Sequence, residues 1–300
     1  MLGTAIFVLA LACVEVGLAG ECAARRAAET WQEEEDQGPQ YIDITIPLAP
    51  GVPLWDHREG LNCMFRHLAE DMRKGHNSFS SWLSLGAHTA THIDSPAHFL
   101  ADQYEAGNTV DKIPLRHLMG RALVVGVPFG RNITADVLAS LDIPDDCERL
   151  LFKTDNTARN LMRTKAFHSD YTALTPDGAQ WLVDHTAVTL VGIDYLSIAT
   201  YDQNKEGHLV LFTKQPEAVT VVEGLDMTYL RPGRWYDLTC LPLRITGADG
   251  APARCVAVGP DAQYEQWRRE QAAAEGAAAG DQAELEDVAE ALAAEHGDEL

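Results

Sequence analysis

Apolar and polar positions along the chain predict a strand-rich fold that begins near Tyr41. Residues 41–48, YIDITIPL, alternate apolar and polar side chains as a strand with one buried face does. Apolar residues return at helical spacing in TADVLASL and TPDGAQWLVDH, which begin at Thr134 and Thr175. A threonine hydroxyl there can accept hydrogen bonds from the free amide groups of a first helical turn. Further strands are predicted in FSSWLSLGAHTATHI, ALVVGVPF, RLLFKT, AVTLVGID, AVTVVEGL, YDLTCLPLRI and RCVAVG.

Interspersed strands and helices predict an α/β fold, a single domain with a mixed β-sheet core and flanking helices over residues 41–259. The preceding residues 21–40 are polar and charged without periodic apolar positions, which is typical of a linker. Residues 260–300 are rich in Ala, Glu and Gln, and this composition predicts an exposed acidic helix or a disordered tail.

Both ends of the chain resemble targeting segments. Residues 1–20 contain an apolar run broken only by Glu15 and then small residues, as a cleaved signal peptide does. The missing basic start favours an N-terminal anchor or a buried helix instead, but the run is short for a membrane span of about 20 residues. The final residues 297–300, GDEL, resemble the Lys-Asp-Glu-Leu retrieval signal. We therefore expect the secretory pathway, within it the endoplasmic reticulum lumen, and no membrane association after cleavage.

Charge and cysteine content narrow the classes of partner. The formal net charge is −22, of which the tail from Asp261 carries −10. This argues against a nucleic-acid partner, because phosphate binding needs a basic surface. Once Cys13 leaves with the signal peptide, five cysteines remain, and an odd number leaves at least one thiol unpaired or linked to another chain. The absence of a C-x-x-C pair disfavours a sulfur-ligated zinc site.

Residues 86–99, GAHTATHIDSPAHF, hold the densest group of chemically capable side chains. Three histidines and an aspartate are ligand types that suit zinc, manganese or iron. If this segment is extended, His88, His92 and Asp94 share one face through the period of two, with the small Ala90 between them. We therefore predict a divalent metal site at these three side chains.

Two features of the same segment refine this prediction. A helical HExxH metalloprotease motif is excluded, because Thr89 stands where the glutamate is needed. His98 lies four residues beyond Asp94 and after a bend at Pro96, which sets it apart from the ligands. We predict that His98 is the general acid and base, since an imidazole with a pKa of about 6.5 exchanges protons at neutral pH.

The segment resembles the His-x-Gly-Thr-His-x-Asp-x-Pro-x-His signature of the cyclase family, which includes bacterial kynurenine formamidases and isatin hydrolases. The blocks RLLFKT, VGIDYLSI and VVEGL also look like recurrent blocks of that family, so the resemblance covers residues 41–259. Ala90 departs from the pattern, because the family has Gly there. The signature is matched at His88, Thr91, His92, Asp94, Pro96 and His98.

The resemblance implies the swivelling β/β/α cyclase fold and a site that a later His and Glu complete, with the Asp able to bridge two ions. His208 and Glu223 match these positions best, although the interval between them is slightly longer than the family pattern implies. Trp55 resembles an aromatic residue that lines the substrate pocket. The resemblance also implies one or two zinc or manganese ions and a homo-oligomer.

Residues and resemblance together predict a hydrolase of a small aromatic or cyclic amide, similar to arylformamidases, in which metal-activated water is the nucleophile. A reading from another class is a metal-binding or regulatory protein on the same scaffold, if Ala90 or the longer interval has abolished turnover. A calcium-buffering protein that uses the acidic tail ranks last, because the tail lacks the D-x-[DN]-x-[DN]-G loop.

Overall fold

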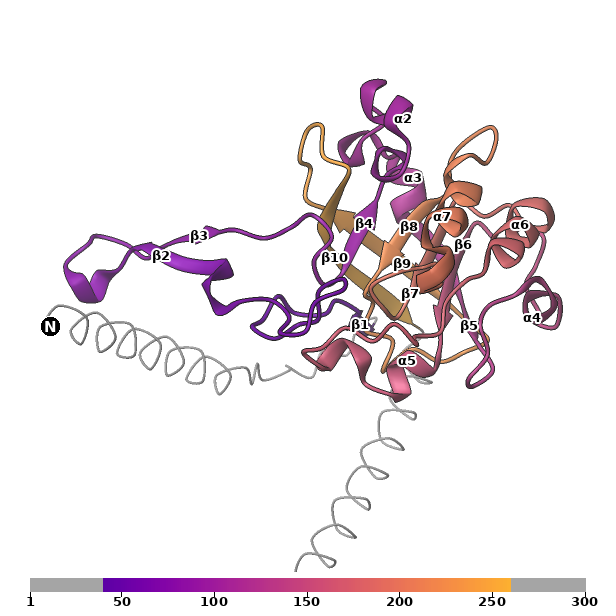
Figure 1. Ribbon diagram of the computed structural model, residues 1–300, viewed down its shortest axis with the longest axis horizontal. Coiled ribbons are helices and arrows are strands. Elements are labelled where there is room, and N and C mark those ends of the chain that lie inside the picture. Colours follow the sequence, from indigo (N-terminus) through magenta and orange to yellow (C-terminus); the bar gives the residue numbers. More distant parts are fainter. Residues whose placement is uncertain (1–39, 260–300) are drawn as a thin grey trace, which may run out of the picture. The chain divides into compact units, whose positions relative to one another are not determined.

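The computed structural model describes residues 40–259 (Figure 1). The predicted signal peptide, the acidic tail and all of the predicted linker except Gln40 lie outside the described residues. Ile42–Ala257 belong to one compact unit, and a second unit of Asp36–Tyr41 with Val258–Leu300 is described only at residues 40, 41, 258 and 259. Within residues 40–259, no helix combines the length and the apolarity that crossing a bilayer requires.

A mixed sheet of eight strands forms the centre of the fold. In the order of hydrogen bonding, the strands are β1 (Gln40–Asp43), β10 (Gly250–Gly259), β4 (His92–Asp94), β8 (Thr220–Glu223), β7 (Leu190–Ile193), β6 (Arg149–Lys153), β5 (Met119–Gly126) and β9 (Arg234–Pro242). β9 also pairs with β10, so the seven strands from β10 to β9 close into a barrel. Strands β5 to β8 run parallel, whereas β4 is antiparallel to both β8 and β10. The mixed sheet was predicted, but its closure was not.

Short helices connect the strands, and the two that the sequence predicts are confirmed. Thr134 Oγ1 accepts a hydrogen bond from Val137 N at the start of α4, and Thr175 Oγ1 accepts one from Gly178 N at the start of α6. The α-helices are α2 (Ala101–Glu105), α3 (Leu115–Leu118), α4 (Ala135–Ala139), α5 (Asp155–Ala158), α6 (Pro176–His185) and α7 (Asn204–Phe212). The 3₁₀ helices are η1 (Cys63–Phe65), η2 (Met72–Lys74), η3 (Pro96–His98), η4 (Val110–Lys112), η5 (Leu161–Arg163) and η6 (Tyr201–Gln203).

The parallel strands supply the core of the molecule. All four residues of β7 and of β8 are buried, as expected for parallel strands that are covered on both faces. Phe152 of β6, Ile193 of β7 and Leu182 of α6 belong to one apolar cluster. Burial of each such side chain contributes about 1.5–3 kcal/mol. This packed core holds the strand end that carries Glu223 in place.

The predicted strand FSSWLSLGAHTATHI is wrong as a single element. Its first part is β3 (Ser80–Leu83), which pairs with β2 (Arg66–Glu70) in a separate two-stranded sheet, and its last part is β4 of the barrel. Between them, residues 87–91 bend instead of extending. The two parts find different partners, which an apolar alternation within one segment cannot reveal.

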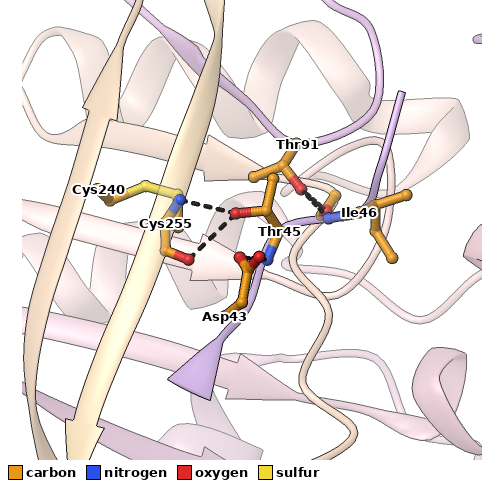
Figure 2. Close-up of a disulfide and its surroundings, with 7 residues drawn as sticks. Asp43, Thr45, Ile46, Thr91, Cys240 and Cys255 are labelled. Atoms are coloured by element: carbon orange, nitrogen blue, oxygen red, sulfur yellow. Dashed lines mark hydrogen bonds between the residues drawn. A yellow bond between two sulfur atoms is a disulfide. The ribbon is translucent and has the colours of Figure 1, made fainter. Parts of the chain in front are cut away.

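A disulfide joins Cys240 of β9 to Cys255 of β10, at the seam where the barrel closes (Figure 2). Both cysteines are fully buried. Thr45 bonds to the same strand, because its Oγ1 accepts from Cys255 N at 2.8 Å and donates to Cys255 O at 3.1 Å. Among residues 40–259, Cys147 is a buried free thiol. The seam is therefore closed by a covalent bond as well as by backbone pairing.

Loss of this disulfide is expected to lower the free energy of unfolding by about 3 kcal/mol, because it closes a loop with a sequence separation of 15 residues. The measurement is urea unfolding of the Cys240→Ala, Cys255→Ala double variant beside the oxidised wild type. A reductant should destabilise the wild type more than the double variant. Equal stability of wild type and double variant would contradict the expectation.

Candidate metal centre

A cavity of about 380 Å³ beside β4 gathers the residues that the sequence singles out. It is lined by Trp55, His88, His92, Asp94, His98, Phe99, Leu196, Ser197, Asn204, His208 and Glu223. All seven side chains that the sequence and the resemblance nominate as ligands, acid-base group or substrate contact thus meet around one space, although they come from positions 55 to 223 of the chain.

The pairing of β4 places three of these side chains. His92 and Asp94 are two residues apart on the strand and therefore point to one face of the sheet. Glu223 of β8 lies directly opposite His92 in the antiparallel register, where facing side chains meet. His92 Nε2 lies 3.2 Å from Glu223 Oε2 and 3.5 Å from Asp94 Oδ1. One imidazole and two carboxylates are thus positioned by the backbone of a central strand.

A sharp turn brings His88 to the same point. Its Nδ1 lies 2.7 Å from Asp94 Oδ1. Ala90 has a left-handed backbone with a φ of 55°, so the prediction of one extended face from residue 88 to residue 94 is wrong, although the three side chains do converge. The reversal at Ala90, and not a period of two, accounts for the position of His88.

Contacts with neighbouring segments hold this turn in place. Thr91 Oγ1 accepts a hydrogen bond from Ile46 N at 2.8 Å (Figure 2) and donates one to Gly224 O. Gly224 has a φ of 66°, and a Cβ added there would lie 2.3 Å from Ala90 O. His92 Nδ1 donates to Ala90 O at 2.9 Å, which leaves His92 Nε2 to face the carboxylates.

Ala90→Gly is expected to change the free energy of unfolding by less than about 1 kcal/mol. Relief of the left-handed strain contributes about 1–2 kcal/mol, and the lost methyl burial with the added chain freedom offsets it. Metal affinity should stay the same, because the Ala90 methyl packs in the apolar core and does not line the cavity. Ala122→Gly is the control, since Ala122 is fully buried on β5 without a positive φ, and it should destabilise. A changed metal affinity in Ala90→Gly would show that the methyl group acts on the centre.

His208 reaches the cavity from α7. Its Nδ1 donates to Asn204 O, one turn earlier, at 2.7 Å. Its Nε2 lies 3.1 Å from Glu223 Oε1 and 3.7 Å from Asp94 Oδ2. Asp94 therefore belongs to two groups whose donor atoms lie within 4.8 Å of one another: His88 with His92 and Asp94, and Asp94 with His208 and Glu223.

The donor set fits a divalent cation. His92 Nε2 and Asp94 Oδ2 are buried and make no hydrogen bond. A buried polar group that makes no hydrogen bond costs about 1–3 kcal/mol, and a cation bound by both atoms would offset this cost. Imidazole nitrogen and carboxylate oxygen are the donors that zinc and manganese accept. These residues can therefore hold an ion at each of the two groups that share Asp94.

Electrostatics in the cavity are dominated by burial and by mutual contacts of opposite charge. Burial opposes the charged form of Asp94, but the hydrogen bond with His88 and the nearby imidazoles hold the pKa of this carboxyl well below its usual range. Burial likewise opposes protonation of His88, yet Asp94 and Asp249 raise its pKa to about 9. His98 differs, because burial and the neighbouring His88 keep its pKa below the ordinary value.

The raised pKa of His88 predicts that metal affinity increases with pH. Below about 9 the ring carries a proton that an ion must displace, so the apparent association constant should rise by about tenfold or more per pH unit up to about 9. In the ion-free protein, by contrast, the free energy of unfolding should fall with pH. The contribution of His88 to stability is lost as pH rises through about 9. Competition with a chelating dye at several pH values measures the affinity. An affinity that does not vary with pH would contradict the prediction.

Further polar residues lie in the cavity or contact the histidines that line it, and the sequence assigned no role to them. Asp249 Oδ2 lies 2.7 Å from His88 Nε2 and 3.0 Å from His98 Nδ1. Asn204 Nδ2 donates to Ser197 Oγ at 2.7 Å, and both residues line the cavity. Asp249 has no local signal in the sequence, because only the pairing of β10 with β4 brings it close.

Trp55 stands in an aromatic group at the side of the cavity. Its ring centroid lies 4.8 Å from that of Phe167 and 5.6 Å from that of Tyr201. Trp55 remains 41% exposed, so neighbouring side chains cover only part of its surface. An apolar aromatic face is thus available to a bound molecule.

Comparisons of sequence and of structure with known proteins match the same kind of protein. The family model described as "Putative cyclase" matches residues 42–200. The chain is 46% identical to "Cyclase-like protein 2" of Arabidopsis thaliana over 73% of this chain and 79% of that protein. It is 30% identical to "Kynurenine formamidase" of Salinibacter ruber, over 72% of this chain and 95% of that protein. The solved structure of a "predicted metal-dependent hydrolase from Bacillus stearothermophilus" superposes with a TM-score of 0.60 at 29% identity, covering 74% of this chain and 98% of that one.

Proposed function

The chain belongs to the cyclase family, and from this premise we propose that it is a metal-dependent hydrolase of the C–N bond in a small aromatic or cyclic amide. One observation carries the proposal: His92 Nε2 and Asp94 Oδ2 are buried without hydrogen bonds, among further donors of the kind that bind metal. Relatives named as a kynurenine formamidase and as a metal-dependent hydrolase support a hydrolase with such a cofactor.

The residues that would hold the cofactor are those of the two groups, with Asp94 common to both. His88 and His92 complete the first group, and His208 and Glu223 complete the second. A divalent ion, zinc or manganese, supplies activated water and polarises a carbonyl at neutral pH. Whether one or two ions bind is a stoichiometry that elemental analysis of the purified protein measures.

His98 is suited to proton transfer. It lines the cavity beside the ligand groups, and its lowered pKa leaves the ring neutral at pH 7, ready to accept a proton. In the proposed reaction it takes the proton of the attacking water and returns that proton to the leaving nitrogen. The other imidazoles of the cavity have raised pKa values through their contacts with carboxylates, which suits them less for this role.

The cavity favours a flat apolar substrate. Trp55, Phe99 and Leu196 line it, and its volume of about 380 Å³ lies in the range of small-molecule sites. An arylformamide such as N-formylkynurenine has an aromatic ring that fits the apolar side of the cavity. Its carbonyl fits the side that carries the ligand groups. The test is a hydrolysis screen of arylformamides, isatins and lactones with metal-analysed protein. Full metal occupancy without turnover of any of them would favour the alternative of a binding or regulatory protein.

We propose further that the protein resides in the endoplasmic reticulum lumen and forms a homo-oligomer. The Cys240–Cys255 disulfide supports an oxidising compartment. Exposed Trp82 of β3 and Phe79 just before this strand support a protein contact there. A reporter with residues 1–40 and the last ten residues should remain in that lumen, and cytosolic residence would refute the location. Light scattering of the purified protein tests the oligomer.

A further inference from the structure

We infer that Asp249 is a positioning residue that fixes the tautomer of both His88 and His98. This inference rests on the proposed function for its effect on turnover, but its structural content concerns only these three side chains. One oxygen, Asp249 Oδ2, lies within hydrogen-bond distance of His88 Nε2, at 2.7 Å, and of His98 Nδ1, at 3.0 Å. An ionised carboxylate can only accept hydrogen bonds, so each ring nitrogen that faces it carries the hydrogen.

Opposite nitrogens of the two rings thereby become free. In neutral His88, a hydrogen on Nε2 leaves the lone pair on Nδ1, the atom 2.7 Å from Asp94 Oδ1 in the first ligand group. In neutral His98, a hydrogen on Nδ1 leaves the lone pair on Nε2, where a proton can be accepted. A single carboxylate thus prepares one imidazole to bind an ion and the other to transfer a proton, as outer carboxylates of metal-binding and acid-base histidines do.

The backbone around Asp249 is anchored to the same strand as the ligands. Asp249 O accepts hydrogen bonds from Ser95 N at 3.0 Å and from Ser95 Oγ at 2.7 Å. The next residue, Gly250, is paired with Asp94 in the register of β10 and β4. A Cβ on Gly250 would lie 2.6 Å from His88 Cε1, so the missing side chain gives the His88 ring its place.

The two imidazoles also contact one another. The rings of His88 and His98 are stacked, with centroids 3.8 Å apart and planes 27° apart. A ring flip of either one would place a carbon against Asp249 Oδ2 and would break a hydrogen bond. Asp249 is 37% exposed in its side chain, so its effect should be that of an outer residue rather than that of a buried ligand. The expected size is about 10–100-fold in metal affinity or turnover.

The geometry allows one competing arrangement, in which His88, His98 and Asp249 hold an ion of their own. In that case Asp249 would bind metal directly and would not accept two hydrogen bonds. Metal stoichiometry separates the two arrangements, because loss of a ligand removes an ion, whereas loss of a positioning group weakens binding and leaves the ion count at saturation unchanged.

The test compares full-length Asp249→Ala with the wild type and with Asp237→Ala, whose aspartate is exposed on the neighbouring strand β9. Nitrogen-15 spectra of histidine-labelled, zinc-loaded protein report the tautomer of each ring. In the wild type, His88 should carry hydrogen on Nε2 and His98 on Nδ1. In Asp249→Ala, His98 should lose this preference, zinc affinity should fall about 10–100-fold, and the zinc count at saturation should equal that of the wild type.

Turnover gives a second readout that a merely structural role would not produce. The kcat of Asp249→Ala should fall about 10–100-fold with little change in KM, and added formate should restore part of it by supplying the missing carboxylate. Formate should leave the wild type and Asp237→Ala unchanged. Unaltered tautomers in Asp249→Ala, or a lost ion at saturation, would overturn the inference. Wild type without any amidase activity but with the expected tautomers would refute the proposed function and leave the role of Asp249 intact.

Discussion

Asp94→Ala is expected to abolish metal binding and turnover together. Asp94 is common to the His88–His92–Asp94 group and the Asp94–His208–Glu223 group, so its removal takes a donor from each. The loss of affinity should exceed the about 10–100-fold that an outer residue contributes. Elemental analysis of the purified variant measures the ion, and an arylformamide assay measures turnover. His92→Ala, which removes one donor from one group, should also lose the ion of that group.

His185→Ala is the matched control for these variants. His185 is an exposed imidazole at the end of α6 and does not line the cavity, so its loss should leave metal content and turnover unchanged. Circular dichroism of each variant establishes that it folds. A folded Asp94→Ala protein with wild-type metal content would show that the centre lies elsewhere.

His98→Ala is expected to keep its metal and to lose turnover by about 10²–10⁴-fold, the usual contribution of a positioned acid-base group. His98 is in neither group that contains Asp94, and its pKa, lowered by burial, suits it to accept a proton at neutral pH. The limb of the pH-rate profile that reports this base should disappear in the variant. The measurements are metal content and kcat on the same preparation.

The outcome for His98→Ala also discriminates between roles. If the variant is as metal-free as His92→Ala, then His98 is a ligand, and His208 becomes the next candidate for proton transfer. If metal and turnover both survive, neither role holds. His185→Ala again serves as the control.

Local patterns predicted the elements better than their assembly. Continuous apolar runs identified the parallel strands β6, β7 and β8, and threonine caps located α4 and α6, because these signals lie within the segments themselves. The closure of the barrel depends on β9 pairing with β5 and β10, which are far from one another in the sequence. Segment-by-segment periodicity contains no information on such pairings.

The residues of the site likewise divide into those predicted from one segment and those that only the assembled fold brings together. Spacing within one segment nominated His88, His92 and Asp94, and the structure brings them together, though through a left-handed turn at Ala90 instead of an extended strand. His208 and Glu223 came from resemblance alone, and their contact joins a side chain of α7 to one at the end of β8. Asp249 was missed because only the pairing of β10 with β4 brings it to His88 and His98.

β4 lies between two antiparallel neighbours, and the candidate metal centre therefore has ligands on segments of different local stability. The amides of His92 and Asp94 lie in an interior strand, so their exchange with deuterated water should require the barrel to open as a whole. His88 lies in a bend and Asp249 in a connection between strands, where smaller openings suffice. In the ion-free protein, the amides around His88 should therefore exchange with deuterated water before those of His92 and Asp94. Local opening of the metal centre should accordingly begin at His88.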